Sequence, residues 1–300
     1  MTILLQTQDL TKQYGAEKAA DSISFNLKKY TSTALIGPNG SGKTTTLSML
    51  AGLVLPTSGT ISFQGNKDFD SRKIIGFLPQ YPKFFPWLTA LEFTEMAARL
   101  SGVETKKARM EAKKTLEFVG LGDAMKKKTS TFSGGMKQRL GLAQAIVHKP
   151  KLLLLDEPVS ALDPVGRRQV MNLLKELQQK TTILYSTHIL NDAEEMTDQL
   201  LFLRKGTLVE QGSLEDVRTR YAKPRILIEF ERQEELARFT KVSPWKFTTT
   251  NRSIVIDVAE EKVEMSAVLS LLHEGIFNIR KVERQTASLE DIFMEVAVIQ

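Results

Sequence analysis

The hydrophobic pattern of the chain alternates between short apolar runs and amphipathic stretches. The apolar runs are TSTALIG at 31–37, KLLLLDEP at 151–158 and TTILYSTH at 181–188. Continuous apolar runs of this length are typical of strands that are buried on both faces of a parallel sheet. Helical periodicity follows the first run in TTTLSMLAGL and the second in GRRQVMNLLKELQQK. Strands that alternate with helices predict an α/β core with a parallel or mixed sheet.

Two further parts of the chain depart from this alternation. From about residue 88 to 148 the pattern is helical, which predicts a helical subdomain beside the core. After residue 217 the pattern predicts strands at 225–230, 253–260 and 277–284 and helices at 265–275 and 288–298. We therefore predict a first domain over 1–217, a linker over 218–224 and a small C-terminal accessory α+β domain over 225–300.

The composition fits a protein with a sizeable core and excludes several kinds of chemistry. The chain has 300 residues, of which 42% are hydrophobic and 25% charged, with no cysteine and three histidines. Disulfides, cysteine nucleophiles and thiolate metal sites are excluded, and the histidines lack the spacing of a zinc site. The chain shows neither a signal-peptide pattern nor a run long enough to span a bilayer, so we expect it in the cytosol.

A glycine-rich loop joins the first predicted strand to the first predicted helix. Residues 37–44, GPNGSGKT, fit the pattern GxxxxGK[ST] in the strand–loop–helix context that the pattern requires. Glycines let successive backbone N–H groups turn toward phosphate oxygens, and the helix dipole favours their negative charge. We expect Lys43 to reach the β- and γ-phosphates of ATP and the Thr44 hydroxyl to hold Mg²⁺. The expected nucleotide-binding residues of this P-loop NTPase core are Gly37, Pro38, Asn39, Gly40, Ser41, Gly42, Lys43, Thr44 and Thr45.

An acidic pair ends the second apolar strand. Asp156 and Glu157 follow four leucines, at the sheet edge where ligands bind in open α/β folds. An acid at the end of a buried strand is costly unless a cation lies beside it, and Mg²⁺ bound with ATP is such a cation. We expect Asp156 to be the second metal ligand and Glu157 to be the general base for water. The structural alternative is an acidic pair that caps a neighbouring turn.

A second pair of glycines precedes another predicted helix. FSGGMKQR at 132–139 runs into LGLAQAIV, and a glycine inside a helix costs about 1 kcal/mol relative to alanine. A helix start with bare backbone N–H groups suits an anion. The chain therefore has two candidate anion-binding helix starts.

Taken in order, these motifs resemble those of the nucleotide-binding subunit of an ABC transporter. The resemblance covers about residues 1–217 and rests on the phosphate loop, Gln80 in FLPQ, FSGGMKQR, LLLLDEP, SALDP and His188 after YST. It implies that two such subunits, identical or homologous, pair head to tail. Each ATP then lies between the phosphate loop of one subunit and the SGG helix of the other. It also implies an integral-membrane permease as partner and a peripheral location on the cytoplasmic face of the membrane.

The resemblance assigns further roles to single residues. Ser133, Gly134 and Gly135 would contact the γ-phosphate of the partner's ATP. Gln80 would contact Mg²⁺ or the attacking water and would transmit the state of the site to the permease.

Three more assignments have structural alternatives. Tyr14 would stack on adenine, or be a core tyrosine. His188 would contact the γ-phosphate, or be a structural residue at a strand end. Asp163 would lie across the dimer interface, or be a turn residue before a proline.

The signature differs from the common LSGGQ of the family. Phe132 and Met136 replace its first and last residues, which puts in doubt any contact that a glutamine at position 136 would make to the nucleotide sugar. SGGMKQR together with SLEDIF at 288–293 resembles the exporter branch typified by drug-resistance and bacteriocin-immunity ATPases.

An aromatic loop follows Gln80. In YPKFFPWLTALEF, exposed aromatic residues and prolines predict a groove for a short helix of a partner. The alternative is that Phe84, Phe85 and Trp87 pack beneath the helical subdomain.

The resulting functional prediction is an ATPase that powers transport, with export as the expected direction, through a separate permease. One alternative, suggested by the net charge of +6, is a soluble ABC-type ATPase that acts on DNA or ribosomes. The lack of cysteines for a zinc module, the compact lobe and the single ATPase unit argue against it, so we expect no nucleic-acid partner. Lysine-rich solvated helix faces also explain the charge. A third reading, a nucleotide sensor without turnover, conflicts with the presence of both Glu157 and His188.

Overall fold

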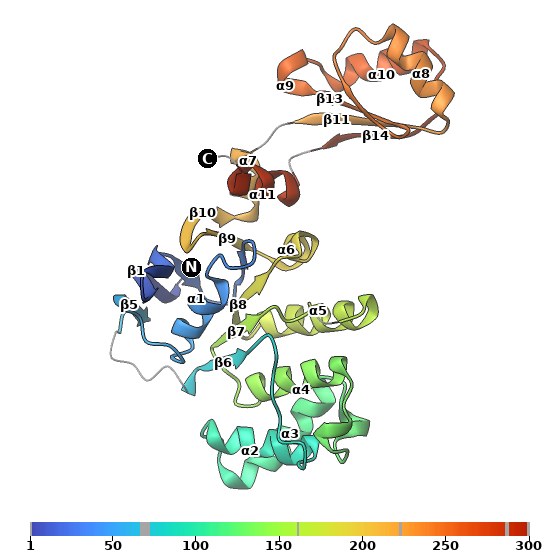
Figure 1. The fold of residues 1–300 in the computed structure, drawn as a ribbon. Coiled ribbons are helices and arrows are strands. Elements are labelled where there is room, and N and C mark those ends of the chain that lie inside the picture. Colours follow the sequence, from blue (N-terminus) through green and yellow to red (C-terminus); the bar gives the residue numbers. More distant parts are fainter. Residues whose placement is uncertain (1, 67–72, 161, 222–223, 286–287, 299–300) are drawn as a thin grey trace. The chain divides into compact units, whose positions relative to one another are not determined.

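The computed structural model describes residues 2–66, 73–160, 162–221, 224–285 and 288–298 (Figure 1). Contacts between residues divide the chain into two compact units. The first contains residues 1–214 and 296–300, and the second contains residues 215–295.

A six-stranded sheet forms the centre of the first unit in the described part of the chain. Its strands are β4 (Ser32–Ile36), β6 (Ile75–Leu78), β7 (Leu152–Asp156), β8 (Thr182–Thr187), β9 (Gln199–Arg204) and β10 (Thr207–Ser213). The order is β10-β9-β4-β8-β7-β6, and all neighbours are parallel except β10 and β9. Every residue of β4, β7 and β8 is buried, as the continuous apolar runs predict. Because parallel strands end at one sheet edge, the residues that follow β4, β6, β7 and β8 lie near one another.

A second sheet, antiparallel, packs over the first. It contains β1 (Ile3–Tyr14), β2 (Glu17–Ile23), β3 (Asn26–Lys28) and β5 (Ser58–Phe63). Helix α1 (Lys43–Leu50) contacts both β2 and β7. Leu47, Met49 and Leu50 of this helix join a core shared with leucines of both sheets. The core therefore fixes where α1, and the loop before it, lies relative to the main sheet.

The helical lobe contains α2 (Ala90–Leu100), α3 (Thr105–Phe118) and α4 (Gly134–Ile146), with 3₁₀ turns η2 (Gly122–Ala124) and η3 (Thr129–Thr131). Thr89 and Glu92 form a capping box that starts α2. Helix α4 contacts β6, so the lobe is tied to the edge of the main sheet. Helices α5 (Pro164–Gln178) and α6 (Leu190–Met196) also belong to the first unit.

The second unit is built on a four-stranded antiparallel sheet of order β12-β13-β11-β14. Its elements are β11 (Arg225–Phe230), α8 (Gln233–Val242), β12 (Thr248–Thr250), β13 (Ser253–Asp257), α9 (Val258–Glu261), α10 (Met265–Glu274) and β14 (Ile279–Gln285). Burial alternates along β11, where Ile226, Ile228 and Phe230 face the core. Helix α11 (Leu289–Val298) follows β14 along the chain.

The structure differs from the sequence prediction in several elements of this region. Helix α7 (Leu214–Arg220) includes the first residues of the predicted linker, because acids in its first turn and arginines in its last turn suit the helix dipole. The strand predicted over 253–260 ends at Asp257, whose carboxylate caps α9 by accepting from the N–H groups of Ala259 and Glu260. Helix α8 and the short strand β12 were not predicted.

Candidate nucleotide-binding site

The phosphate loop occupies residues 37–42, between β4 and α1. Gly42 has a φ of 100°, and a Cβ there would lie 2.3 Å from the carbonyl oxygen of Ala19. A Cβ on Gly37 would lie 2.3 Å from the carbonyl oxygen of Leu203. Only glycine fits both positions, because the backbones of β2 and β9 approach the loop this closely. Within the described residues α1 has no side-chain N-cap, so its first N–H groups are available to an anion.

The loop bounds a cavity of about 440 Å³ whose lining suits a nucleotide phosphate chain. The lining residues are Glu17, Ala19, Asn39, Gly40, Ser41, Gly42, Lys43, Thr44, Thr45, Gln80 and Glu157. The Ser41 Oγ is buried and has no hydrogen-bond partner among the described residues. A buried donor without a partner is costly, and a phosphate oxygen would satisfy it. The loop therefore fits the phosphates of ATP.

The side chain of Lys43, which the sequence predicts to reach the phosphates of ATP, lies against the backbone of the loop. Its Nζ donates to the carbonyl oxygens of Gly37, at 2.8 Å, and Pro38, at 3.0 Å. Burial lowers the pKa of the Lys43 ammonium, and the carboxylates of Glu157 and Asp156 oppose this shift. The cation is thus held in the loop by neutral carbonyl groups and lies near the two acids at the end of β7.

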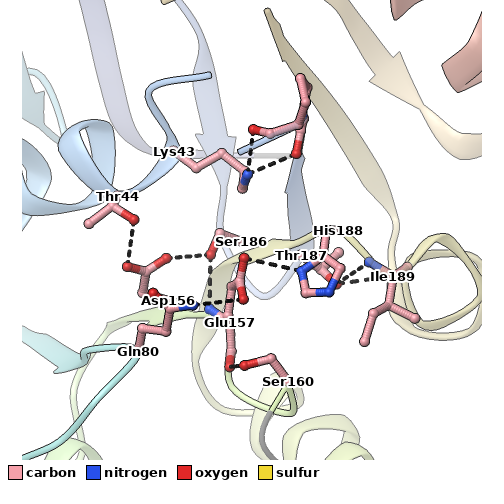
Figure 2. A network of polar contacts seen from close by, with 12 residues as sticks. Lys43, Thr44, Gln80, Asp156, Glu157, Ser160, Ser186, Thr187, His188 and Ile189 are labelled. Carbon is pink, nitrogen blue, oxygen red and sulfur yellow. Dashed lines mark hydrogen bonds and ion pairs between the residues drawn. The ribbon is translucent and has the colours of Figure 1, made fainter. Parts of the chain in front are cut away.

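The acidic pair comes from the end of β7 and meets the loop directly. The Thr44 Oγ1 donates to the Asp156 Oδ2 at 2.8 Å, so two of the three residues predicted to hold Mg²⁺ are in contact (Figure 2). Hydroxyl and carboxylate oxygens are ligands that Mg²⁺ prefers, with substrate phosphates and waters completing its coordination. The two residues therefore fit a magnesium ion that is bound together with ATP.

The Glu157 carboxylate lies between two other predicted residues. Gln80 Nε2 donates to its Oε2 at 2.9 Å, and His188 Nδ1 lies at hydrogen-bond distance, 3.1 Å, from its Oε1 (Figure 2). Gln80 follows β6 and His188 follows β8, the strands on either side of β7. Glu157 is 9% exposed and has a φ of 48°, in the left-handed region that a non-glycine residue rarely occupies. A strained residue in a cleft is a frequent feature of functional sites.

The paired glycines lie elsewhere, at the start of α4. Ser133 is the N-cap, and its Oγ accepts from the N–H of Met136 at 3.3 Å. Ser133, Gly135 and Met136 line a second cavity of about 430 Å³, together with Asp163. The two cavities share no lining residue.

The surroundings of Asp163 and Tyr14 bear on whether Asp163 is a turn residue and whether Tyr14 is a core tyrosine. Asp163 is the N-cap of α5, and its Oδ1 accepts from the N–H of Gly166 at 3.1 Å. Its role as a helix cap is thus compatible with its place on the wall of the second cavity. Tyr14 ends β1 and is 53% exposed, with the Lys12 Nζ 5.1 Å from its ring centre. Such exposure is that of a surface tyrosine and not of a core tyrosine.

Sequence reasoning missed several residues of the site. Glu17 and Ala19 of β2 line the phosphate cavity, and Arg139 lines the second cavity. Ser186 of β8 contacts both members of the acidic pair. The available signal for Ser186 was its position two residues before His188, at the end of a strand predicted to be buried.

The chain matches known proteins along nearly its whole length. Residues 20–160 match the family described as "ABC transporter", and residues 212–297 match the C-terminal domain described as "ATP-binding protein DrrA1-3-like". YxlF of Bacillus subtilis (strain 168), described as an uncharacterized ABC transporter ATP-binding protein, is 40% identical over 98% of this chain and 99% of its own. The bacitracin transport ATP-binding protein BcrA of Bacillus licheniformis is 34% identical over 98% of this chain and 97% of its own.

The fold also matches solved structures. The dimeric structure of a post-hydrolysis state of the ATP-binding cassette MJ0796, bound to ADP and Pi, has a TM-score of 0.65 and 28% identity. The match covers 70% of this chain and 99% of that chain. The predicted P-loop core is confirmed by this likeness. Among the described residues, none belongs to a helix long and apolar enough to cross a bilayer. With such extensive identity to YxlF and BcrA, the chain belongs to the ABC transporter ATP-binding proteins, and it is an ATPase.

Proposed function

We propose that the chain binds and hydrolyses Mg-ATP as one of two head-to-tail subunits that drive export through a separate membrane-spanning partner. The observation that carries this proposal is the separation of the two anion-binding helix starts. The start of α1 lines one cavity with Glu157, and the start of α4 lines another cavity with Asp163. A second subunit is needed to bring the two kinds of surface onto one ATP. The relative BcrA is a bacitracin transport protein, which supports the transport of a drug-like substrate by this chain.

The residues in and beside the first cavity have different roles in hydrolysis. The backbone N–H groups of the loop and the Lys43 ammonium bind the β- and γ-phosphates. Thr44, Asp156 and Gln80 would hold Mg²⁺, and the bound ion would neutralise negative charge on the phosphates. Glu157 accepts a proton from the attacking water as the new O–P bond forms and the bond to the ADP oxygen breaks. His188 contacts the γ-phosphate and, in this structure, orients the Glu157 carboxylate.

The second cavity binds the γ-phosphate of the partner's ATP. Ser133, Gly134 and Gly135 offer N–H groups at the start of a helix whose dipole favours an anion. ATP therefore holds two subunits together, and loss of the γ-phosphate releases them.

Substitution of Gly135 tests whether the start of α4 binds the partner's ATP. A Cβ on Gly135 would make only ordinary contact, 3.5 Å from Leu162 Cδ2, so a side chain fits without unfolding the lobe. The Gly135→Asp variant should lose ATP-driven dimerisation and about 100-fold or more in hydrolysis rate, because its carboxylate repels the partner's phosphate. Nucleotide binding by the monomer should stay unchanged, as measured by equilibrium titration. Thr105→Asp adds the same charge at an exposed position of α3 in the same lobe, away from the lining of the second cavity, and should behave like the parent chain.

Mixing two inactive variants tests whether each ATP is bound by residues of both subunits. Gly135→Asp keeps an intact phosphate loop, and Lys43→Ala keeps an intact paired-glycine helix. An equimolar mixture forms mixed dimers in which one of the two composite sites is complete. If the sites act independently, the mixture should regain about a quarter of the parent rate, whereas each variant alone stays inactive. An inactive mixture, with an active parent chain, contradicts shared sites that act independently, whereas a mixture that regains activity requires residues of both subunits at one ATP.

The aromatic loop after Gln80 provides a docking surface for the membrane-spanning partner. Phe84 packs edge to face on the buried Phe93, with ring centres 5.0 Å apart, as the packing alternative predicts. Trp87, however, is 65% exposed, and its ring centre lies 5.3 Å from that of the exposed Phe85. Beside them lies a groove of about 340 Å³ lined by Pro82, Lys83, Phe84, Pro86, Thr129, Ser130 and Lys137. Such a groove suits a short partner helix.

The exposed aromatic pair is expected to matter only when the partner is present. The double substitution Phe85→Ala with Trp87→Ala should leave hydrolysis by the isolated chain within about twofold of the parent. It should lower, by about tenfold or more, the fraction of chain that sediments with membranes containing the partner. Leu100→Ala removes an equally apolar side chain, 81% exposed, from α2 of the same lobe and should sediment normally. Equal sedimentation of the double variant and this control would remove the exposed aromatic pair from the proposed docking surface.

A further inference from the structure

Ser186 lies between the two acidic residues that the proposed mechanism separates into metal ligand and base. It is fully buried and pairs with Asp156 in the register of β7 and β8. Its Oγ donates to the Asp156 Oδ1 at 2.6 Å and accepts from the backbone N–H of Glu157 at 2.9 Å (Figure 2). One hydroxyl thus contacts both halves of the acidic pair.

The hydroxyl constrains the direction of both groups. A serine hydroxyl has one proton and two lone pairs, so donation to Asp156 leaves a lone pair for the Glu157 N–H. The other Asp156 oxygen accepts from Thr44, so neither carboxylate oxygen of Asp156 is free to rotate away from its donor. The orientation of the metal ligand is therefore tied to the backbone of the general base.

The backbone at Glu157 needs such a constraint. Its φ of 48° costs a non-glycine residue about 1 kcal/mol or more, so the native conformation must be fixed by its surroundings. The hydrogen bond from the Glu157 N–H fixes the peptide plane from which the side chain extends toward Gln80 and His188. A small rotation of this peptide would move the carboxylate away from both partners.

We propose that Ser186 is a positioning residue for ATP hydrolysis: its hydroxyl couples the orientation of Asp156 to that of the Glu157 base. The inference rests on the proposed roles of these two acids. Ser186 itself lies outside the residues that line the phosphate cavity. Its removal should therefore affect the hydrolytic step and leave the binding of the phosphates to the loop largely unchanged.

The chain contains a matched control for this hydroxyl. Ser32 lies on β4, the other neighbour of β8, and is also fully buried. Its Oγ has no hydrogen-bond partner among the described residues. Ser32→Ala therefore removes the same atom from the same sheet without breaking a side-chain hydrogen bond.

The test compares Ser186→Ala, Ser186→Thr and Ser32→Ala in the full chain. Ser186→Ala should lower kcat by about 10- to 100-fold, because misplacement of a reacting group by about 1 Å costs this much. Its KM for Mg-ATP and its nucleotide affinity should stay within about twofold of the parent, and an ATP-held dimer should accumulate. Ser186→Thr should regain most of kcat, since it keeps the hydroxyl, and Ser32→Ala should be unchanged. If Ser186→Ala does not fold, Ser186→Cys replaces it, because a thiol of similar size is a much weaker donor and acceptor.

Three results would overturn the inference. The first is a parent-like kcat for Ser186→Ala, or for Ser186→Cys in its place. The second is a threonine variant as slow as the alanine variant. The third is an equal loss in Ser32→Ala, which would assign the effect to packing. A different result would contradict the proposed function: normal ATP hydrolysis by the Glu157→Gln variant. An inactive Glu157→Gln with a parent-like Ser186→Ala rejects only the role of Ser186.

Discussion

The Glu157→Gln variant is expected to bind Mg-ATP normally and to hydrolyse it about 1,000-fold more slowly than the parent chain, because a positioned general base contributes about 10²- to 10⁴-fold to such a step. The substitution keeps the size of the side chain and a carbonyl oxygen that can accept from Gln80. It removes the group that takes the proton from water. Phosphate release under single-turnover conditions measures the effect.

The same variant should accumulate as an ATP-held dimer. Without hydrolysis the γ-phosphate remains between the phosphate loop of one subunit and the α4 start of the other. Size-exclusion chromatography at saturating Mg-ATP should therefore show a dimer that disappears with Mg-ADP. Glu176→Gln, which removes a charge from an exposed glutamate of α5, serves as the control and should behave like the parent. A Glu157→Gln chain that hydrolyses ATP normally would remove Glu157 from the role of base.

The Lys43→Ala variant should lose about 10- to 100-fold in affinity for Mg-ATP, because charge-assisted hydrogen bonds to phosphate contribute about 1.5–3 kcal/mol. The ammonium lies in the loop on the carbonyl oxygens of Gly37 and Pro38 and needs only a small movement to reach a phosphate. Isothermal titration with a slowly hydrolysed ATP analogue measures the loss.

Two further variants separate charge from folding at this position. Lys43→Met keeps most of the apolar stem in the buried loop, so it should match Lys43→Ala in affinity while retaining the parent's thermal unfolding midpoint. Lys18→Ala removes an exposed lysine of β2 that pairs with Asp21, and its affinity should not change. Parent-like affinity in both Lys43 variants would contradict the assignment of this residue to the phosphates.

Much of the first cavity could be predicted because its chemistry is local in sequence. The phosphate loop and the first turn of α1 are consecutive residues, so one motif specifies the tight turn, the cation and the hydroxyl together. The acidic pair at the end of β7 and the histidine after β8 were predictable for a related reason. Parallel strands end at one edge, so residues that end such strands meet there.

Other parts depended on which strands are neighbours. The order β6-β7-β8 places Gln80 and His188 on opposite sides of Glu157, and the register of β7 and β8 places Ser186 against Asp156. An apolar strand sequence is compatible with several neighbours and registers, because its side chains can be buried equally well in each. The strained backbone of Glu157 was not visible in the sequence for the same reason, since its cause is a set of contacts from other strands.

The amino-acid sequence alone determined the kinds of chemistry that this protein has: a phosphate-binding helix start, a carboxylate pair, a second helix start with paired glycines, and no thiol chemistry. These are properties of residue types and short spacings. Only the tertiary structure decided that the two helix starts open into different cavities of one subunit, and that a buried serine links the metal ligand to the base. Distances between residues far apart in sequence follow from sheet order and packing in three dimensions, and no short spacing along the chain encodes them.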